Sequence, residues 1–185
     1  MTGQEYRFYR YLTRPADKEL EISLPEGYEI RLFIPKFPRI VPPNLTRGLR
    51  HNFCSWWAMR VLGVFSRSEE YKVYTVYNAE DFAHYTVVVP RHFKFPFMGD
   101  NDIQANPVYT APEHRRKGLA HAVIVQIKKD YAESGGCLWY VVRPENLPSI
   151  AHIEKLGFEL YAIGAKAKRL GLSFLGRYEI GSLLK

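Results

Sequence analysis

The sequence predicts a single mixed α/β domain: a central sheet with a parallel pair of strands, antiparallel strands on both flanks and helices on both faces. Two short apolar strands flank an amphipathic helix in the second half of the chain, and a right-handed crossover of this kind makes such strands parallel. A pair of strands joined by a short turn precedes this unit, and two more strands follow it. The 185 residues, 46% hydrophobic and 24% charged, suffice for one domain with a substantial core.

The first hundred residues supply flanking strands and one helix. Strand character begins at residues 28–35, and a proline-rich loop follows. Residues 51–65 are apolar enough for a packed helix, and Asn52 is a suitable N-cap. Residues 71–78 and 82–89 are two strands with a short turn between them, which predicts a β-hairpin.

The second half carries the strand, helix, strand unit. Residues 102–110 form a strand that Pro107 interrupts, which predicts a bulge or an unpaired edge. A helix begins around Lys117 and ends at the pair of glycines 135–136. The run CLWYVV at 137–142 is typical of a strand covered on both faces.

The helix after Lys117 has an apolar face. Six residues recur there at helical spacing: Leu119, Ala120, Val123, Ile124, Ile127 and Tyr131. We expect residues 128–130, two lysines and an aspartate, to lie largely on the solvent side. A second helix begins near Asn146 and ends at Gly157, and residues 158–164 and 172–180 supply the last two strands.

Composition limits the classes of function. The net charge of +7 and the pI of about 9.4 suit an anionic partner: nucleic acid, a membrane surface or a phosphorylated small molecule. No apolar run approaches the roughly 20 residues of a membrane span, and the start has no secretory signal. Cys54 and Cys137 lack partners at metal-binding or catalytic spacing, so we expect two buried free thiols in a cytoplasmic protein.

The stretch EHRRKGLAHAVI, residues 113–124, places Arg115, Arg116 and Lys117 directly before Gly118 at a helix start. Cations there oppose the helix dipole unless an anion lies on them. Free N–H groups at the start, with a glycine that has no Cβ, make a place for a diphosphate. The alternative is a solvated basic turn with an incidental glycine. The Walker and dinucleotide-binding glycine patterns are both absent from the sequence.

Two blocks of sequence resemble a known family. Arg115-x-x-Gly118-x-Ala120 is similar to the (Q/R)-x-x-G-x-(G/A) signature of the GNAT N-acetyltransferase superfamily. Asn146, Ser149 and the ending EKLGF at 154–158 resemble a second block of that superfamily, in the right order and with one strand between. The resemblance covers roughly residues 108–161, and the pair of blocks is far more specific than either alone.

The resemblance implies an enzyme that binds acetyl-CoA and transfers the acetyl group to an amine, without a metal. It implies that the pantetheine arm lies beside a central strand that splays from its parallel neighbour, and that the diphosphate sits on the basic turn. The residues expected to contact the donor are Val108, Tyr109, Thr110, Arg115, Arg116, Lys117, Gly118, Leu119, Ala120, Asn146, Ser149 and His152.

The sequence departs from the pattern of this superfamily at the positions of the acid and the base. Ile153 stands where many members carry a tyrosine, and Gln104 and Val141 stand where some carry a glutamate. Asp102, which would share a strand face with Gln104, is the first candidate base, through water; the alternative is that it caps the strand or binds a neighbour.

Two other polar residues complete the catalytic candidates. Gln104 belongs to the group because of its position, although it cannot take up a proton. His84 is the second candidate base, and a half-buried structural histidine is the alternative. Positioning with a water relay is a further route that needs neither.

The acceptor side is aromatic and basic. Candidate contacts to an anionic acceptor are Arg47, Arg50, His51, Trp56 and Trp57, with core packing as the alternative for the tryptophans. A loose resemblance of the segment HFKFPFMGDNDIQ to bacterial GNAT proteins of surface-polysaccharide pathways points to an amino-sugar nucleotide. An amino acid, an antibiotic or a protein N-terminus stay open as acceptors.

We therefore expect one domain over residues 1–185, with an acceptor-side half at 1–100 and an acyl-CoA-binding half at 101–185. The expected function is acetyl-CoA-dependent N-acetylation of a small primary amine. A non-catalytic acyl-CoA-binding module of the same fold, or a protein or amino-acid N-acetyltransferase, is the alternative. A nucleic-acid or membrane-surface binder lacks a recognisable motif. The oligomeric state is open, with a homodimer among the options.

Overall fold

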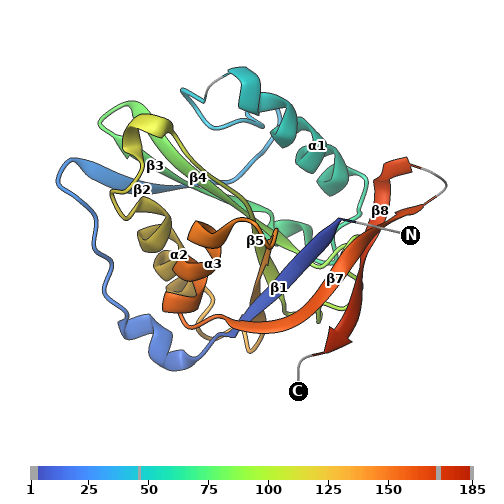
Figure 1. The fold of residues 1–185 in the computed structure, drawn as a ribbon. Helices are drawn as coiled ribbons and strands as arrows, with labels where there is room; N and C mark the ends of the chain where they lie inside the picture. The colour runs from blue at the N-terminus through green and yellow to red at the C-terminus, as the bar shows by residue number, and fades with distance from the viewer. Residues whose placement is uncertain (1–3, 46, 170–171, 184–185) are drawn as a thin grey trace.

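The computed structural model describes residues 4–45, 47–169 and 172–183. Within them the chain forms one eight-stranded sheet in the order β2-β3-β4-β5-β6-β1-β7-β8 (Figure 1). Only β5 and β6 among its neighbouring strands are parallel. The strands are β1 (Glu5–Leu12), β2 (Tyr28–Phe33), β3 (Lys72–Asn78), β4 (Asp81–Pro90), β5 (Ile103–Thr110), β6 (Cys137–Val142), β7 (Glu159–Arg169) and β8 (Leu172–Leu183).

The helices lie on both faces of this sheet. They are α1 (Arg50–Val61), α2 (Leu119–Asp130) and α3 (Leu147–Lys155), with short 3-10 turns η1 (Pro15–Glu19), η2 (Arg47–Leu49), η3 (Ser68–Glu70) and η4 (Pro112–His114). Helices α2 and α3 lie on one face of the sheet and α1 on the other (Figure 1). Buried side chains of α2 and α3 pack with the central strands in one core cluster, and Phe53 of α1 belongs to a second cluster. The predicted mixed fold, with its central parallel pair, is confirmed.

The parallel pairing of β5 with β6 is short. It joins Ile103 to Leu138 and Gln104 to Trp139, and β5 then stays paired only with β4 as far as Thr110. A bulge at residues 106–107 shifts the register of β5 against β4, at the proline that the sequence marked. The two parallel strands therefore separate toward their carboxyl ends and leave a gap between them.

The first strand, β1, is a feature that the sequence analysis did not predict. It lies between β6 and β7 and pairs antiparallel with both, for example Phe8 with Val141 and with Ala162. Phe8 is fully buried. This strand belongs to the first hundred residues but completes the sheet of the second half, so it is an exception to a division of the chain at residue 100.

Several local expectations need correction. Helix α1 begins at Arg50 with Leu49 as its N-cap, so Asn52 lies within the helix and does not cap it. Helix α1 ends at Val61 rather than near residue 65, because Gly63 adopts a left-handed conformation (φ 66°). Neither cysteine is buried as predicted. Cys54 on this helix is exposed, because the helix packs through Phe53 instead, and Cys137 is half-buried.

Lys128 on α2 is buried rather than solvent-facing. Its ammonium lies 3.5 Å from the centre of the Tyr11 ring and donates to the carbonyl of Leu156 at the end of α3. Burial lowers the pKa of Lys128 to about 8. An aromatic face and a helix C-terminus, which both favour a cation, explain why a lysine is tolerated there.

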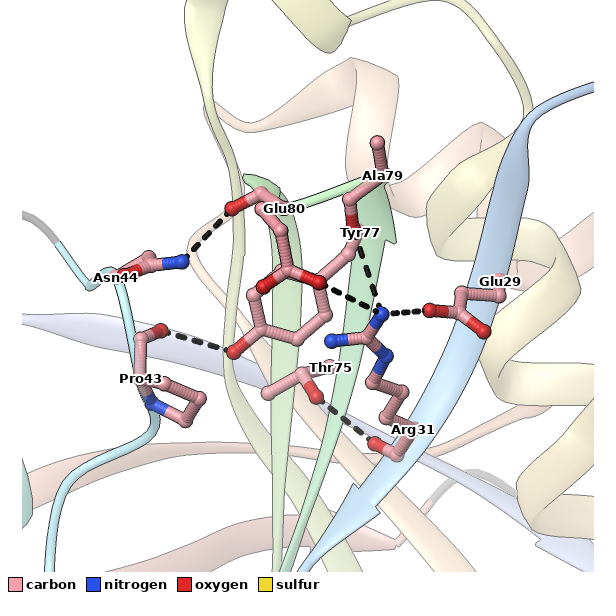
Figure 2. A network of polar contacts seen from close by, with 8 residues as sticks. All are labelled: Glu29, Arg31, Pro43, Asn44, Thr75, Tyr77, Ala79 and Glu80. Atoms are coloured by element: carbon pink, nitrogen blue, oxygen red, sulfur yellow. Dashed lines mark hydrogen bonds and ion pairs between the residues drawn. The ribbon is translucent and has the colours of Figure 1, made fainter.

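The long loop between β2 and α1 is tied to the turn between β3 and β4 (Figure 2). The Tyr77 hydroxyl donates to the Pro43 carbonyl (2.9 Å), and the Asn44 amide donates to the Glu80 carbonyl (2.8 Å). The Arg31 guanidinium lies 4.7 Å from the centre of the Tyr77 ring, between these two contacts and the edge strand. The loop between β2 and α1 is thus fixed at the edge of the sheet. No helix in the described part of the chain is long and apolar enough to cross a membrane.

Candidate functional site

A cavity of about 770 Å³ lies where β5 leaves β6. It is enclosed by the end of β5, the turn after it and the first residues of α2 and α3. Eleven of the residues expected to contact a donor line it: Val108, Tyr109, Thr110, Arg115, Arg116, Gly118, Leu119, Ala120, Asn146, Ser149 and His152. Its lining also includes four residues that the sequence analysis did not select: His114, His121, Tyr140 and Pro148. The structure thus brings two distant sequence blocks to one cavity.

The turn before α2 leaves the start of this helix open. Gly118, the N-cap, has φ 75°, and Arg116 two positions earlier also adopts a left-handed conformation (φ 61°). A Cβ added to Gly118 would meet no heavy atom of the described chain within 4 Å. The first N–H groups of a helix have no partner within it, so this open start is suited to bind an anion. Left-handed turn residues of this kind also gather N–H groups into anion-binding concavities.

The charges around the turn are positive. The side chains of Arg115 and Arg116 are exposed, and the first turn of α2 holds no acidic residue. Arg115 is partly fixed, because its Nε donates to the carbonyl of Thr110 (3.2 Å). Positive side chains and the positive end of a helix dipole therefore meet at one place, which favours a ligand with at least one negative charge.

Lys117 differs from the other cations of the turn, because it is not among the residues that line the cavity. Its ammonium donates to the hydroxyl of Tyr28 on the edge strand β2 (2.7 Å). Nothing in the local sequence pattern indicates this contact, since the two residues lie 89 positions apart.

Asn146 takes up one of its expected roles. Its side-chain oxygen accepts a hydrogen bond from the backbone N–H of Ser149 (3.3 Å) and so caps α3. Both residues also line the cavity. The starts of α2 and α3 therefore both border the same cavity.

Tyr140 on β6 is the residue that the sequence analysis missed most clearly. It follows Trp139, the last residue of β6 paired with β5, and so lies where the strands begin to separate. It is 8% exposed and lines the cavity. Burial raises the pKa of Tyr140, while a hydrogen bond with the Ser149 side chain acts in the opposite direction. A phenol that stays protonated at neutral pH can donate a proton; the available signal was its place as the hydroxyl-bearing residue in the run CLWYVV.

His152 on α3 lies beside His121 on α2, with 5.8 Å between their ring centres. Burial lowers the pKa of His152, and the nearby His121 and Lys155 lower it further. Its Nε2 is buried and has no hydrogen-bond partner among the described residues. His152 is therefore a neutral imidazole at neutral pH, with one ring nitrogen free for a proton or a ligand.

Asp102 lies away from the cavity lining. Its carboxylate accepts hydrogen bonds from the backbone N–H of Gly99 (2.8 Å), from that of Cys137 (2.8 Å) and from the indole N–H of Trp139 (2.7 Å). Three N–H donors occupy acceptor sites on the two oxygens of this carboxylate. These contacts favour the structural alternative, in which Asp102 joins the loop before β5 to the start of β6.

His84 is also engaged in structure. One ring nitrogen bonds to the Thr110 hydroxyl (2.7 Å) and the other to the Thr86 hydroxyl (2.9 Å). Burial, with a contribution from nearby His152, lowers the pKa of His84 to about 3. These contacts favour the structural alternative for this residue, which orients Thr110 at the cavity wall.

Gln104, the third catalytic candidate, is 1% exposed and is not among the cavity-lining residues. Both polar atoms of its amide are buried without a hydrogen-bond partner among the described residues. It lies opposite Trp139, at the last parallel pair. The structure therefore does not bring the three catalytic candidates together at the cavity.

The aromatic residues of α1 divide between two roles. Trp56 stacks on Phe65, with ring centres 6.2 Å apart, and belongs to the core on that face. Trp57 lies 6.3 Å from the ring of Phe37, which is 81% exposed. Arg50 donates to a loop carbonyl (3.3 Å), and the side chains of residues 47 and 51, an arginine and a histidine, lie outside the described part. Among the described residues, no group of three or more His, Cys, Asp or Glu is placed to hold a metal ion.

Residues 104–169 match the family model described as FR47-like protein. No curated protein matches the chain in sequence. The segment covers β5, the basic turn, α2, β6, α3 and β7, and so contains the residues that line the cavity.

Solved structures share the fold. One is a tandem GNAT protein from the clavulanic acid biosynthesis pathway, with a TM-score of 0.61 and 18% identity over 87% of this chain and 51% of that one. A GCN5-related N-acetyltransferase from Sphaerobacter thermophilus has a TM-score of 0.56 and 11% identity over 87% of this chain and 50% of that one. A functionally unknown conserved protein from Staphylococcus epidermidis has a TM-score of 0.55 and 12% identity over 86% and 58%. The chain spans about half the length of these structures, and at such identities the similarity is one of fold.

Proposed function

Because the chain has the GNAT N-acetyltransferase fold and an FR47-like segment, we propose that it is an acyl-CoA-dependent N-acyltransferase. In this proposal it moves an acetyl group from acetyl-CoA to a primary amine. The observation that carries the proposal is one continuous cavity, which joins the open helix start at Gly118 to the gap between β5 and β6. A long ligand with a diphosphate at one end and a neutral arm at the other fits these two regions.

The donor lies with its diphosphate on the N–H groups at the start of α2 and on the side chains of Arg115 and Arg116. Its pantetheine arm runs along residues 108–110 of β5, which lack a strand partner on the side of β6. An extended ligand can hydrogen-bond to such a free strand edge as an added strand would. The thioester then reaches the point where the strands separate, beside Tyr140.

The chemistry requires three contributions from the protein. A backbone N–H of β5 polarises the carbonyl as the amine nitrogen bonds to its carbon. The carbon–sulfur bond then breaks, and the leaving thiolate takes the proton of the Tyr140 hydroxyl. The amine gives up its proton to the neutral imidazole of His152. A proton then passes from His152 through solvent to the Tyr140 oxygen, which restores both side chains. The products are an N-acetylated amine and free CoA.

The proposed acceptor is a small primary amine with a negatively charged group, of which an amino-sugar nucleotide is one example. The net charge of +7 and the exposed ring of Phe37 beside Trp57 support an acceptor with an anionic group and a flat or sugar-like surface. The loop that bears Phe37 is fixed further along, at Pro43 and Asn44 (Figure 2). A protein N-terminus or an amino acid is the alternative acceptor.

The proposal is tested in two stages. Isothermal calorimetry and thermal melting with acetyl-CoA test binding; we expect a saturable site and a raised melting temperature. Release of free thiol across a panel of amines then tests transfer, with the acetylated product identified by mass spectrometry. An unmoved melting temperature with salt-sensitive DNA binding would contradict the proposal.

A non-catalytic acyl-CoA-binding module is the second candidate function. The observation that favours it is that Asp102 and His84 are both held in structural hydrogen bonds. Tight binding of acetyl-CoA with no thiol release across the whole amine panel would decide for this module.

A further inference from the structure

Four polar side chains connect the basic turn to the edge of the sheet. The Lys117 ammonium lies 2.7 Å from the hydroxyl oxygen of Tyr28. The same hydroxyl lies 2.8 Å from Nδ1 of His114, and the other ring nitrogen of His114 lies 3.0 Å from the carboxylate of Asp81. The four residues come from the turn before α2, from β2, from η4 and from the first position of β4.

The two ends of this row fix the direction of its two outer hydrogen bonds. An ammonium only donates, so Lys117 donates to the Tyr28 oxygen, and a carboxylate only accepts, so Asp81 accepts from His114 Nε2–H. An imidazole with its one hydrogen on Nε2 leaves Nδ1 to accept the Tyr28 hydroxyl hydrogen. The row is therefore fully satisfied with a neutral histidine, and Tyr28 both accepts and donates.

The middle of the row is rigid. His114 is 5% exposed, and its ring meets the Tyr28 ring edge to face, with 5.7 Å between centres. Its backbone N–H donates to the Ala111 carbonyl (2.9 Å), and the Ala111 N–H donates in turn to Ala83 on β4 (2.9 Å). The Lys117 ammonium also lies 5.2 Å from the centre of the Tyr28 ring, within the range of a cation–π contact. An exposed, flexible lysine is thus held on a rigid aromatic residue.

Lys117 does not line the cavity, but its chain neighbours Arg116 and Gly118 do. We propose that Tyr28 is a positioning residue that holds the Lys117 ammonium beside this turn, where its charge attracts the diphosphate of the bound donor. The inference rests on the proposed function, because it assumes that the turn at Gly118 binds the diphosphate. A free lysine side chain loses rotamer freedom when it meets an anion, and Tyr28 removes part of that cost before the donor arrives. Tyr28 then acts on affinity only through Lys117 and only for ligands that carry phosphate.

A double-mutant cycle on acetyl-CoA affinity tests this coupling. Tyr28→Phe keeps the ring but removes the hydroxyl, and Lys117→Met removes the charge from an exposed side chain. We expect Tyr28→Phe to raise the Kd by about 3- to 10-fold, the factor associated with ordering one long side chain. In the Lys117→Met background the same change should have less than about a twofold effect, since no ammonium is left to hold.

Two controls separate this role from a general loss of stability. Tyr77→Phe also removes a hydroxyl that bonds to a loop at the same edge of the sheet, but not at the basic turn. It should lower the melting temperature without changing the acetyl-CoA Kd. S-acetylpantetheine, which lacks the phosphates, should bind equally well to the wild type and to Tyr28→Phe.

The outcomes distinguish the two proposals. If the wild type fails to bind acetyl-CoA, the proposed function is wrong and the inference falls with it. If the wild type binds acetyl-CoA but the Kd of the double variant rises by the product of the two single effects, the proposed function stands. The positioning role of Tyr28 is then wrong. Equal weakening of acetyl-CoA and S-acetylpantetheine binding in Tyr28→Phe would also overturn it.

Discussion

Replacement of Gly118 by glutamate tests the place of the diphosphate directly. Gly118 has φ 75°, and a side chain there would extend into open space over the helix start. The substitution lowers the free energy of unfolding only by the strain of a left-handed residue with a side chain, about 1–2 kcal/mol. For a domain of this size that corresponds to a fall in melting temperature of about 2–8 °C, so we expect Gly118→Glu to fold.

The effect on binding should be much larger than the effect on folding. A carboxylate about 5 Å from each of two phosphate charges costs about 1–3 kcal/mol per charge at effective dielectric constants between about 80 and 20. The Kd for acetyl-CoA should therefore rise at least about 10-fold. In a melting assay, acetyl-CoA at 100 times the wild-type Kd stabilises the wild type by about 2.7 kcal/mol. We expect most of that stabilisation to vanish in the variant.

Gly135→Glu is the matched control. Gly135 is also left-handed (φ 65°) with open space around its Cβ position, but it lies after α2, at the end opposite the turn. The same strain should therefore lower its melting temperature, with no change in acetyl-CoA affinity. If Gly118→Glu bound acetyl-CoA as tightly as Gly135→Glu, the diphosphate could not lie on the start of α2, and our account of the cavity would be refuted.

Three further predictions follow from the structure. Asp102→Asn turns an NH₂ group toward one of three N–H donors, so the free energy of unfolding in urea should fall by about 2–4 kcal/mol. The acetyl-CoA Kd should stay within about twofold, and an unchanged free energy of unfolding would refute the structural role. Tyr140→Phe should lower the rate of acetyl transfer at least about 10-fold with little change in acetyl-CoA affinity; unchanged turnover would exclude it as proton donor. Burial lowers the pKa of His84 to about 3 and that of His92 to about 4, so the unfolded chain takes up protons first and stability falls as the pH drops below about 6.5. The free energy of unfolding should fall by about 2 kcal/mol per histidine by about pH 5. In urea unfolding at stepped pH, His92→Phe should roughly halve this fall. An unchanged dependence of the free energy of unfolding on pH would contradict the buried neutral state.

The sequence predicted the features that depend on near neighbours along the chain. The hairpin of β3 and β4, the apolar run of β6 and the start of α2 at Gly118 each follow from patterns within a dozen residues. Periodicity and backbone chemistry act over that range, so they can be recognised without a structure. The same reasoning located Asn146 as the cap of α3, because the capped N–H is only three positions away.

Lys128 and Asp102 show where local pattern is insufficient. Helical spacing placed Lys128 toward solvent, but Tyr11 and the end of α3 cover it, and neither is close to it in sequence. Asp102 looked free to act as a base because two of its N–H partners, on Cys137 and Trp139, lie at least 35 positions away. A polar side chain in a sequence has the same chemistry whether it is saturated or free; only its packed surroundings distinguish the two.

The sequence by itself thus determined the class of fold, the strand, turn and helix that form one wall of the cavity, and the charge of the basic turn. The tertiary structure decided that β1 enters the sheet between β6 and β7, that Tyr140 reaches the point where the strands separate, and that Tyr28 holds Lys117 from 89 positions away. The physical reason is that helical and turn preferences are set by adjacent residues, whereas strand partners and side-chain contacts are chosen among all segments of the chain by burial and hydrogen bonding.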